Sequence, residues 1–107
     1  DADRIERERM VSRLKEGGFI HDDEPSEEEL VLAMHAYLAA SPALLLAVSL
    51  VDVVGEKLPQ NLPGTNAEYP NWFVPLHAFN GKEVLIDDMA HCDRVKRFLT
   101  SVDRYIR

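Results

Sequence analysis

The stretch Ala43-Leu-Leu-Leu-Ala-Val48 decides the fold that this sequence predicts. It is apolar throughout, too short for an amphipathic helix, and without the polar alternation of a half-exposed strand. A continuous apolar run of this length is typical of a strand that is covered on both faces, as in a parallel sheet. We therefore expect a buried strand over residues 43–49, and a strand preceded by a helix is one unit of an α/β fold.

Helices are expected before and after this strand. An apolar stripe at helical spacing predicts a first helix over residues 4–16. A second is predicted over residues 27–40, because Ser26 and Glu29 form a capping box at its start. A third is predicted over residues 93–106. The apolar positions behind these predictions are Ile5, Met10, Val11 and Leu14, then Leu30, Met34, Tyr37 and Leu38, then Val95, Phe98, Leu99, Val102 and Ile106.

The chain after Gly55 is expected to be irregular, because Pro59, Pro63 and Pro70 break regular structure. Further on, Asn80-Gly81 lies between two short apolar runs and predicts a short hairpin. No repeat or low-complexity linker divides the chain. The predicted fold is therefore a single α/β domain of 107 residues, mostly helical, with one buried strand and a short hairpin.

Composition and charge exclude several classes of partner. Lys and Arg number 12 against 19 Asp and Glu, a net charge of -7, so the chain lacks the basic surface that nucleic acid requires. No apolar stretch approaches the ~18 residues that span a bilayer, so a membrane is not expected either. The single cysteine, Cys92, cannot form an internal disulfide, which favours the cytoplasm. Because the chain begins with Asp1 and not Met, we expect it to be processed or cut from a longer protein.

Patterns that would indicate a metal site, a nucleophile or a nucleotide are missing. The histidines His21, His35, His77 and His91 lack the spacing of metal ligands, and Cys92 has no partnered base. No glycine-rich loop precedes a Lys-Ser or Lys-Thr pair. We therefore expect no cofactor and no metal.

The loop over residues 60–72 carries the chemistry that suits a sugar. Its amides and hydroxyl can pair with sugar hydroxyl groups, and Trp72 offers an aromatic face to the C–H side of a pyranose ring. Pro63-Gly64 is expected to fix a tight turn. The alternative is an ordinary ordered loop with a buried Trp. Asp52, placed after the expected strand, is either a functional carboxylate at the strand's end or a cap of a helix or turn.

The same residues resemble a family. Asn61-Leu-Pro-Gly-Thr65 and Glu68-Tyr-Pro-Asn-Trp72, preceded by Leu50-Val-Asp-Val-Val-Gly55, are similar to the C-terminal part of the amylomaltases, the bacterial 4-alpha-glucanotransferases. The resemblance extends over roughly residues 26–90, and the residues after Trp72 are similar to the longer, actinobacterial type.

The resemblance implies a fragment of a larger enzyme. The family's catalytic domain is a (β/α)8 barrel, which needs ~250 residues, so this chain would be its C-terminal end. Transfer of 1,4-alpha-glucan segments between maltooligosaccharides needs a carboxylate pair, which lies upstream in the family, so no catalytic residue is assigned and the chain alone is expected to be inactive. The expected substrate-binding residues are Asn61, Pro63, Gly64, Thr65, Asp52, Asn71 and Trp72.

A second interpretation is a stand-alone noncatalytic domain that binds a protein or a carbohydrate through the same loop. The two differ in whether the gene continues upstream into a barrel with the missing carboxylates. A barrel strand separated from its neighbours would also leave unpaired backbone groups and apolar faces. The isolated chain is therefore expected to self-associate or to repack this strand against its own helices.

Overall fold

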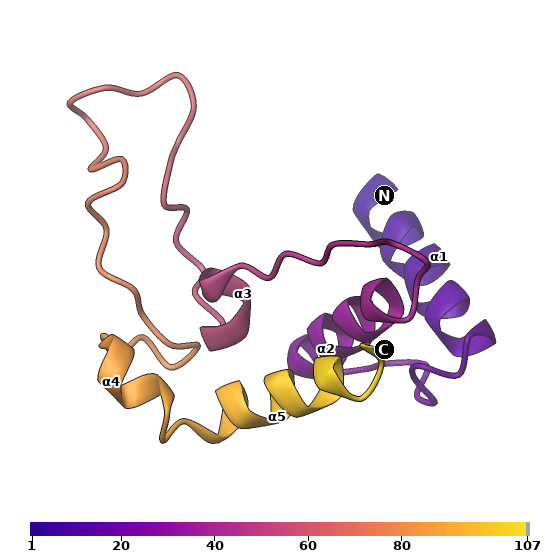
Figure 1. Cartoon of the computed structure of the whole chain (residues 1–107). Helices are drawn as coiled ribbons and strands as arrows, with labels where there is room; N and C mark the ends of the chain where they lie inside the picture. Colours follow the sequence, from indigo (N-terminus) through magenta and orange to yellow (C-terminus); the bar gives the residue numbers. More distant parts are fainter. Residues whose placement is uncertain (107) are drawn as a thin grey trace. The chain divides into compact units, whose positions relative to one another are not determined.

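A computed structural model of the chain describes residues 1–106. Its helices, labelled in Figure 1, are α1 (Ala2–Glu16), α2 (Glu27–Ala39), α3 (Leu50–Val54), α4 (Ile86–Met89) and α5 (Asp93–Asp103). Within residues 1–106 no strand forms, and β pairing is limited to an isolated antiparallel bridge between His77 and Glu83. No helix in this part of the chain is long and apolar enough to cross a membrane.

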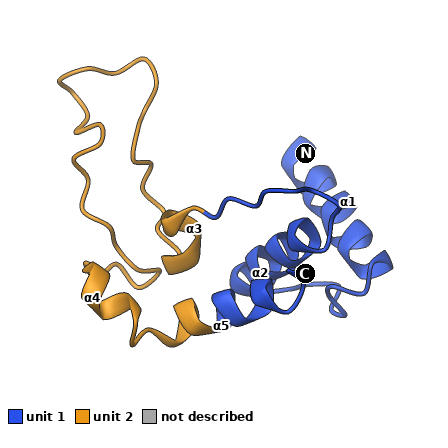
Figure 2. Cartoon of the chain, in the orientation of Figure 1, with its two compact units in different colours: residues 1–48, 97–107 blue, residues 49–96 orange. Residues whose placement is uncertain are grey.

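The chain divides into two compact units, shown in Figure 2. The first consists of residues 1–48 and 97–107, and the second of residues 49–96. Helices α1 and α2 belong to the first unit and α3 and α4 to the second, while α5 begins in the second and continues into the first.

The core of the first unit forms where α1 meets α2. Two α1 side chains, Val11 and Leu14, are buried together with Ile20 and with Leu30 and Ala33 of α2. Of these, Val11, Leu14 and Leu30 belong to the stripes that predicted the helices, and the burial of the cluster from water stabilises the pair. The mostly helical character expected from the sequence is therefore confirmed.

The ends of α1 and α2 follow from local hydrogen bonds. Ser26 Oγ accepts from the Glu29 backbone N–H (3.2 Å) and Glu29 Oε2 accepts from the Ser26 N–H (2.8 Å), which confirms the predicted capping box. Helix α1 begins earlier than predicted because the Asp1 side chain accepts from the Asp3 N–H (3.2 Å). The C-terminal helix α5 ends at Asp103 and not at residue 106.

The strand predicted over residues 43–49 is wrong for this chain. The segment has no regular structure, and Leu44 and Leu45 are 98% and 91% exposed. A strand needs a neighbouring strand to pair its backbone groups, and no other segment within residues 1–106 supplies one. The chain by itself is therefore not α/β. The apolar sequence continues instead into α3, which the left-handed Gly55 ends.

The second unit is built around α3. Val53 and Val54 are buried in it, as is Val95 at the start of α5. The predicted hairpin is present in a short form: the Ala78 N–H donates to the Lys82 carbonyl (2.8 Å) across the Asn80-Gly81 turn. The second run of the predicted hairpin does not extend as a strand, because Ile86 already begins α4.

Candidate functional site

A long loop, residues 57–76, carries nearly all the residues that the sequence singled out. It has no helix or strand, as expected from its prolines. The chain leaves α3 at Gly55 and returns to the hairpin that precedes α4 (Figure 1). Glu56 makes the contacts that close the base of the loop, and Thr65 and Asn71 make the contacts that shape its tip.

Gly55 sets the direction in which the chain leaves α3. Its φ of +78° lies in the left-handed region, which side chains other than hydrogen disfavour. A Cβ there would also lie 2.9 Å from Cζ of Arg94 and 3.0 Å from Cβ of Phe79. Arg94 is itself buried and donates from Nε to the Val53 carbonyl (3.1 Å). Only glycine therefore fits between the end of α3 and these two side chains.

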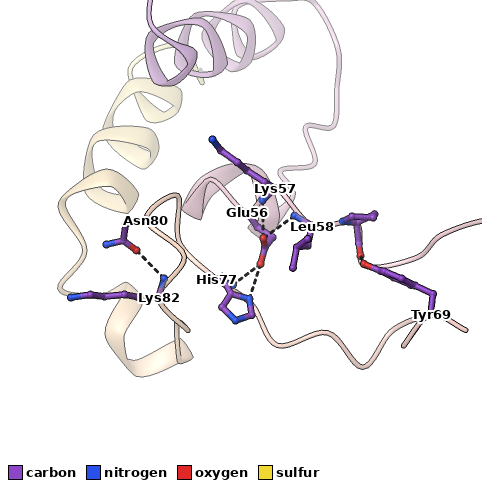
Figure 3. A network of polar contacts seen from close by, with 8 residues as sticks. Glu56, Lys57, Leu58, Tyr69, His77, Asn80 and Lys82 are labelled. Atoms are coloured by element: carbon purple, nitrogen blue, oxygen red, sulfur yellow. Dashed lines mark hydrogen bonds and ion pairs between the residues drawn. The ribbon is translucent and has the colours of Figure 1, made fainter.

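Glu56 joins the two ends of the long loop. Its Oε1 accepts from the backbone N–H groups of Lys57 (2.7 Å) and Leu58 (2.9 Å). Its Oε2 accepts from the backbone N–H of His77 (2.7 Å) and faces Nδ1 of the same residue at 3.1 Å (Figure 3). The Glu56 side chain is only 3% exposed. The buried carboxylate thus joins the start of the loop to His77, which lies 21 positions after Glu56.

These contacts also set the protonation of the carboxyl group. Burial alone would raise the pKa of Glu56, but hydrogen bonds from the N–H groups of Leu58, His77 and Lys57 and from the His77 ring outweigh it. The pKa of Glu56 is therefore held below its ordinary value, and the group is a carboxylate at neutral pH.

Further contacts cross the loop beyond this point. The Tyr69 hydroxyl donates to the Pro59 carbonyl, also drawn in Figure 3, and the Trp72 N–H donates to the Gln60 carbonyl (2.7 Å). The loop is therefore an ordered pair of chain segments. Its conformation does not depend on regular secondary structure.

The tip of the loop is fixed by Thr65 and Asn71. The Thr65 N–H donates to the Leu62 carbonyl (3.2 Å) and Gly64 has a φ of +85°, which confirms the turn predicted at Pro63-Gly64. The Thr65 hydroxyl also donates to the Leu62 carbonyl (2.6 Å) and accepts from Asn71 Nδ2 (3.0 Å). Asn71 Oδ1 accepts from the Leu62 N–H (2.7 Å). The hydrogen bonds of both side chains therefore stabilise the conformation of the tip.

Among the expected site residues of the loop, Asn61 and Trp72 are exposed without forming the turn at the tip, whereas the exposed Pro63 and Gly64 form that turn. The Asn61 side chain is exposed and forms no hydrogen bond within residues 1–106. Trp72 is 74% exposed, so it is not the buried Trp of an ordinary ordered loop. Its φ of +66° is rare for a bulky residue, and its backbone N–H donates to the Gln60 carbonyl. The loop therefore offers an amide and an aromatic face on a fixed frame.

Asp52 lies apart from this group of residues. It is exposed in the first turn of α3, where a negative charge suits the positive end of a helix. The N-cap of α3 is Ser49, so Asp52 is not the cap of this helix. The structure does not place it at the end of a strand, because no strand precedes it.

Sequence reasoning missed Glu56, and it quoted Tyr69 within the Glu68–Trp72 run without giving it a role. Their hydrogen-bond partners lie 21 and 10 positions away, so no short motif predicts these contacts. One signal for Glu56 was present: residues 31–81 carry few charges, so an acid placed directly before the loop is unusual. Within residues 1–106, no group of three His, Cys, Asp or Glu side chains is arranged to hold a metal ion.

The chain is similar to known proteins over most of its length. Residues 1–80 match the Glyco_hydro_77 family model, described as 4-alpha-glucanotransferase. Over 87 residues, 80% of this chain, it is 45% identical to proteins named 4-alpha-glucanotransferase from Mycobacterium bovis and Mycobacterium tuberculosis. It is 44% identical over 39 residues, 36% of this chain and 6% of the relative, to a protein of that name from Haemophilus influenzae. The match spans 12% of the length of the mycobacterial relatives, and no solved structure matches the chain.

Proposed function

This chain belongs to the 4-alpha-glucanotransferase family, and from that premise we propose that it is the C-terminal part of an enzyme that transfers 1,4-alpha-glucan segments between maltooligosaccharides. In this proposal the chain contributes a substrate-binding loop, and the rest of a (β/α)8 barrel contributes the chemistry. The short span matched in the mycobacterial relatives, 12% of their length, fits such a division. We place the enzyme in the cytoplasm, because the single cysteine needs no oxidising compartment.

The observation that carries the proposal is the tip of the long loop. It lies inside the part of the chain that matches the family, and it presents Asn61 and Trp72 to solvent. A pyranose ring has hydroxyl groups around its edge and C–H groups on its faces, so it is bound by amides and aromatic planes. Neither side chain contributes to a core, which supports a role in binding.

The other expected residues have supporting roles in this proposal. Thr65 and Asn71, with the turn at Pro63-Gly64, hold the tip so that Asn61 and Trp72 keep their orientation. For Asp52, which lies in α3 and not in the loop, the support for a substrate-binding role is the family resemblance alone. No carboxylate of this chain is assigned to catalysis, since retaining transfer needs a matched pair of carboxyl groups on either side of the scissile bond.

The proposal is tested by Asn61→Ala in the full-length protein that contains this chain. Losing one polar partner of the substrate costs about 1–3 kcal/mol, so kcat/KM for maltotriose disproportionation should fall by about 10- to 100-fold. The melting temperature should stay the same, because Asn61 makes no hydrogen bond within residues 1–106. Glu83→Gln, at an exposed position outside the loop, is the control and should leave activity unchanged.

The chain by itself provides the second test. Because it holds no assigned carboxylate pair, the isolated 107 residues should release no glucose from maltotriose. Activity of the isolated chain would overturn the division of roles. Unchanged activity of Asn61→Ala in the full-length protein would reduce the loop to a folded connection.

A further inference from the structure

We propose that Glu56 is a positioning residue for the long loop: its buried carboxylate joins the two ends of residues 57–76 and so fixes the orientation in which Asn61 and Trp72 meet a glucan. This inference rests on the function proposed above. Glu56 itself touches no substrate in this proposal and acts only through the loop backbone.

The geometry at the base of the loop supports this role. The two carboxylate oxygens divide the ends of the loop between them, Oε1 taking the N–H groups of Lys57 and Leu58 and Oε2 taking the N–H and the ring of His77. All four contacts are between 2.7 and 3.1 Å, and the side chain is 3% exposed. Water therefore cannot readily replace the carboxylate as the acceptor for these donors.

To join the two ends of the loop, the side chain at position 56 must be a carboxylate, and another side chain of the same shape does not suffice. Both Oε1 and Oε2 face donors only, and an ionised carboxyl group is the acceptor-only side chain of this length. A glutamine has the same shape but places an NH2 group against backbone N–H groups at one end of the loop or the other. Glu56→Gln therefore keeps the packing but breaks the contacts that join residues 57 and 58 to His77, which we call the junction.

The contacts of Glu56 matter for the tip because they lie where the loop leaves α3 and returns to the hairpin. Beyond them the two segments are joined by the hydrogen bonds already described, among them the Trp72 N–H to the Gln60 carbonyl, Tyr69 to Pro59 and the Leu62 N–H to Asn71. Trp72 is held at a φ of +66°, a conformation that persists only where its surroundings enforce it. Closing a long irregular loop is opposed by its conformational entropy, and Glu56 offsets this cost at the point where the two segments separate.

The experiment compares Glu56→Gln with Glu83→Gln in the full-length protein. Glu83 is an exposed acid of the same unit whose side chain makes no hydrogen bond within residues 1–106, so it controls for the loss of one charge. We expect Glu56→Gln to speed hydrogen exchange of peptides within residues 57–76 by about 10-fold or more. We expect kcat/KM for maltotriose disproportionation to fall by about 10-fold, mostly through KM, since the loop binds substrate and transition state alike. Glu83→Gln should change neither.

His77→Ala gives a graded second variant. It removes the ring donor but keeps the backbone N–H that Glu56 also binds, so its effects on exchange and KM should be smaller, about 3-fold. If Glu56→Gln does not fold, this variant decides: normal exchange and normal KM in His77→Ala would overturn the inference.

The outcomes separate this inference from the proposed function. Unchanged exchange of residues 57–76 in Glu56→Gln would overturn the positioning role. So would faster exchange with an unchanged KM, provided that Asn61→Ala still lowers kcat/KM. An inert Asn61→Ala would instead contradict the proposed function, while the exchange readout would still report whether Glu56 holds the loop.

Discussion

A buried carboxylate is stable only if donors replace the water that it has lost. Glu56 meets this condition with three backbone N–H groups and the His77 ring. Protonating it would convert an acceptor into a donor that faces other donors. The order of the long loop is therefore linked to the charge of one residue.

The charge on Glu56 predicts how the stability of the loop changes with pH. Because the pKa of Glu56 is lower in the folded chain than in the unfolded one, its contribution to stability is present above the unfolded pKa, about 4.3, and is lost as the pH falls through the folded pKa. We expect the amide signals of Lys57 and Leu58, which both donate to this carboxylate, to shift together as the pH falls below about 4.3, measured by NMR. Glu56→Gln should abolish this titration.

Comparing Gly55 with Gly81 separates the cost of a left-handed backbone in a residue other than glycine from the cost of a steric clash. Gly55 and Gly81 have φ values of +78° and +80°, but a Cβ would meet Arg94 and Phe79 only at Gly55 and nothing within 4 Å at Gly81. Gly81→Ala should therefore show the conformational cost alone, about 1 kcal/mol. Gly55→Ala should cost about 1–3 kcal/mol more because the buried side chains must move. Urea denaturation of the two variants measures the difference, and equal costs would contradict it.

Among the elements, α2 is specified most locally. Its capping box lies within four consecutive residues, Ser26 to Glu29. The pKa of Glu29 is lowered first by the hydrogen bond from the Ser26 backbone N–H and second by the one from the Ser26 hydroxyl. Ser26→Ala should destabilise the chain by about 1 kcal/mol, seen as a lower melting temperature by circular dichroism. Ser12→Ala, at an exposed position inside α1, is the control and should not destabilise, since Ala is the better helix former.

Locality explains which elements the sequence could predict. The start of α2 and the Pro63-Gly64 turn depend on residues a few positions apart, and both were predicted correctly. The strand over residues 43–49 failed because a strand depends on a partner segment, which residues 1–106 do not contain. The Glu56–His77 junction spans 21 positions and leaves no periodic trace, so only the scarcity of charge around it could have drawn attention to it.

At the scale of the whole molecule, the apolar run of residues 43–48 is the feature least suited to water. Leu44 and Leu45 are almost fully exposed, although each leucine gains about 1.5–3 kcal/mol on complete burial. In the proposed full-length enzyme, the rest of the barrel would cover this run. In the isolated chain, another copy of the same segment is the available cover.

We therefore predict that the isolated chain self-associates through residues 43–48. Two leucines from each of two copies recover only part of the cost of association, so the complex should be weak and form at about 0.1 mM and above. Light scattering should show the mean mass rising over a concentration series, and Leu44→Ser with Leu45→Ser should abolish the rise without changing the helical circular dichroism signal. Ile86→Ser, at an exposed apolar position of α4, is the control and should still associate. A chain that remains monomeric throughout the series would contradict the prediction. If the full-length protein is monomeric while the isolated chain associates, the missing part of the enzyme covers the segment.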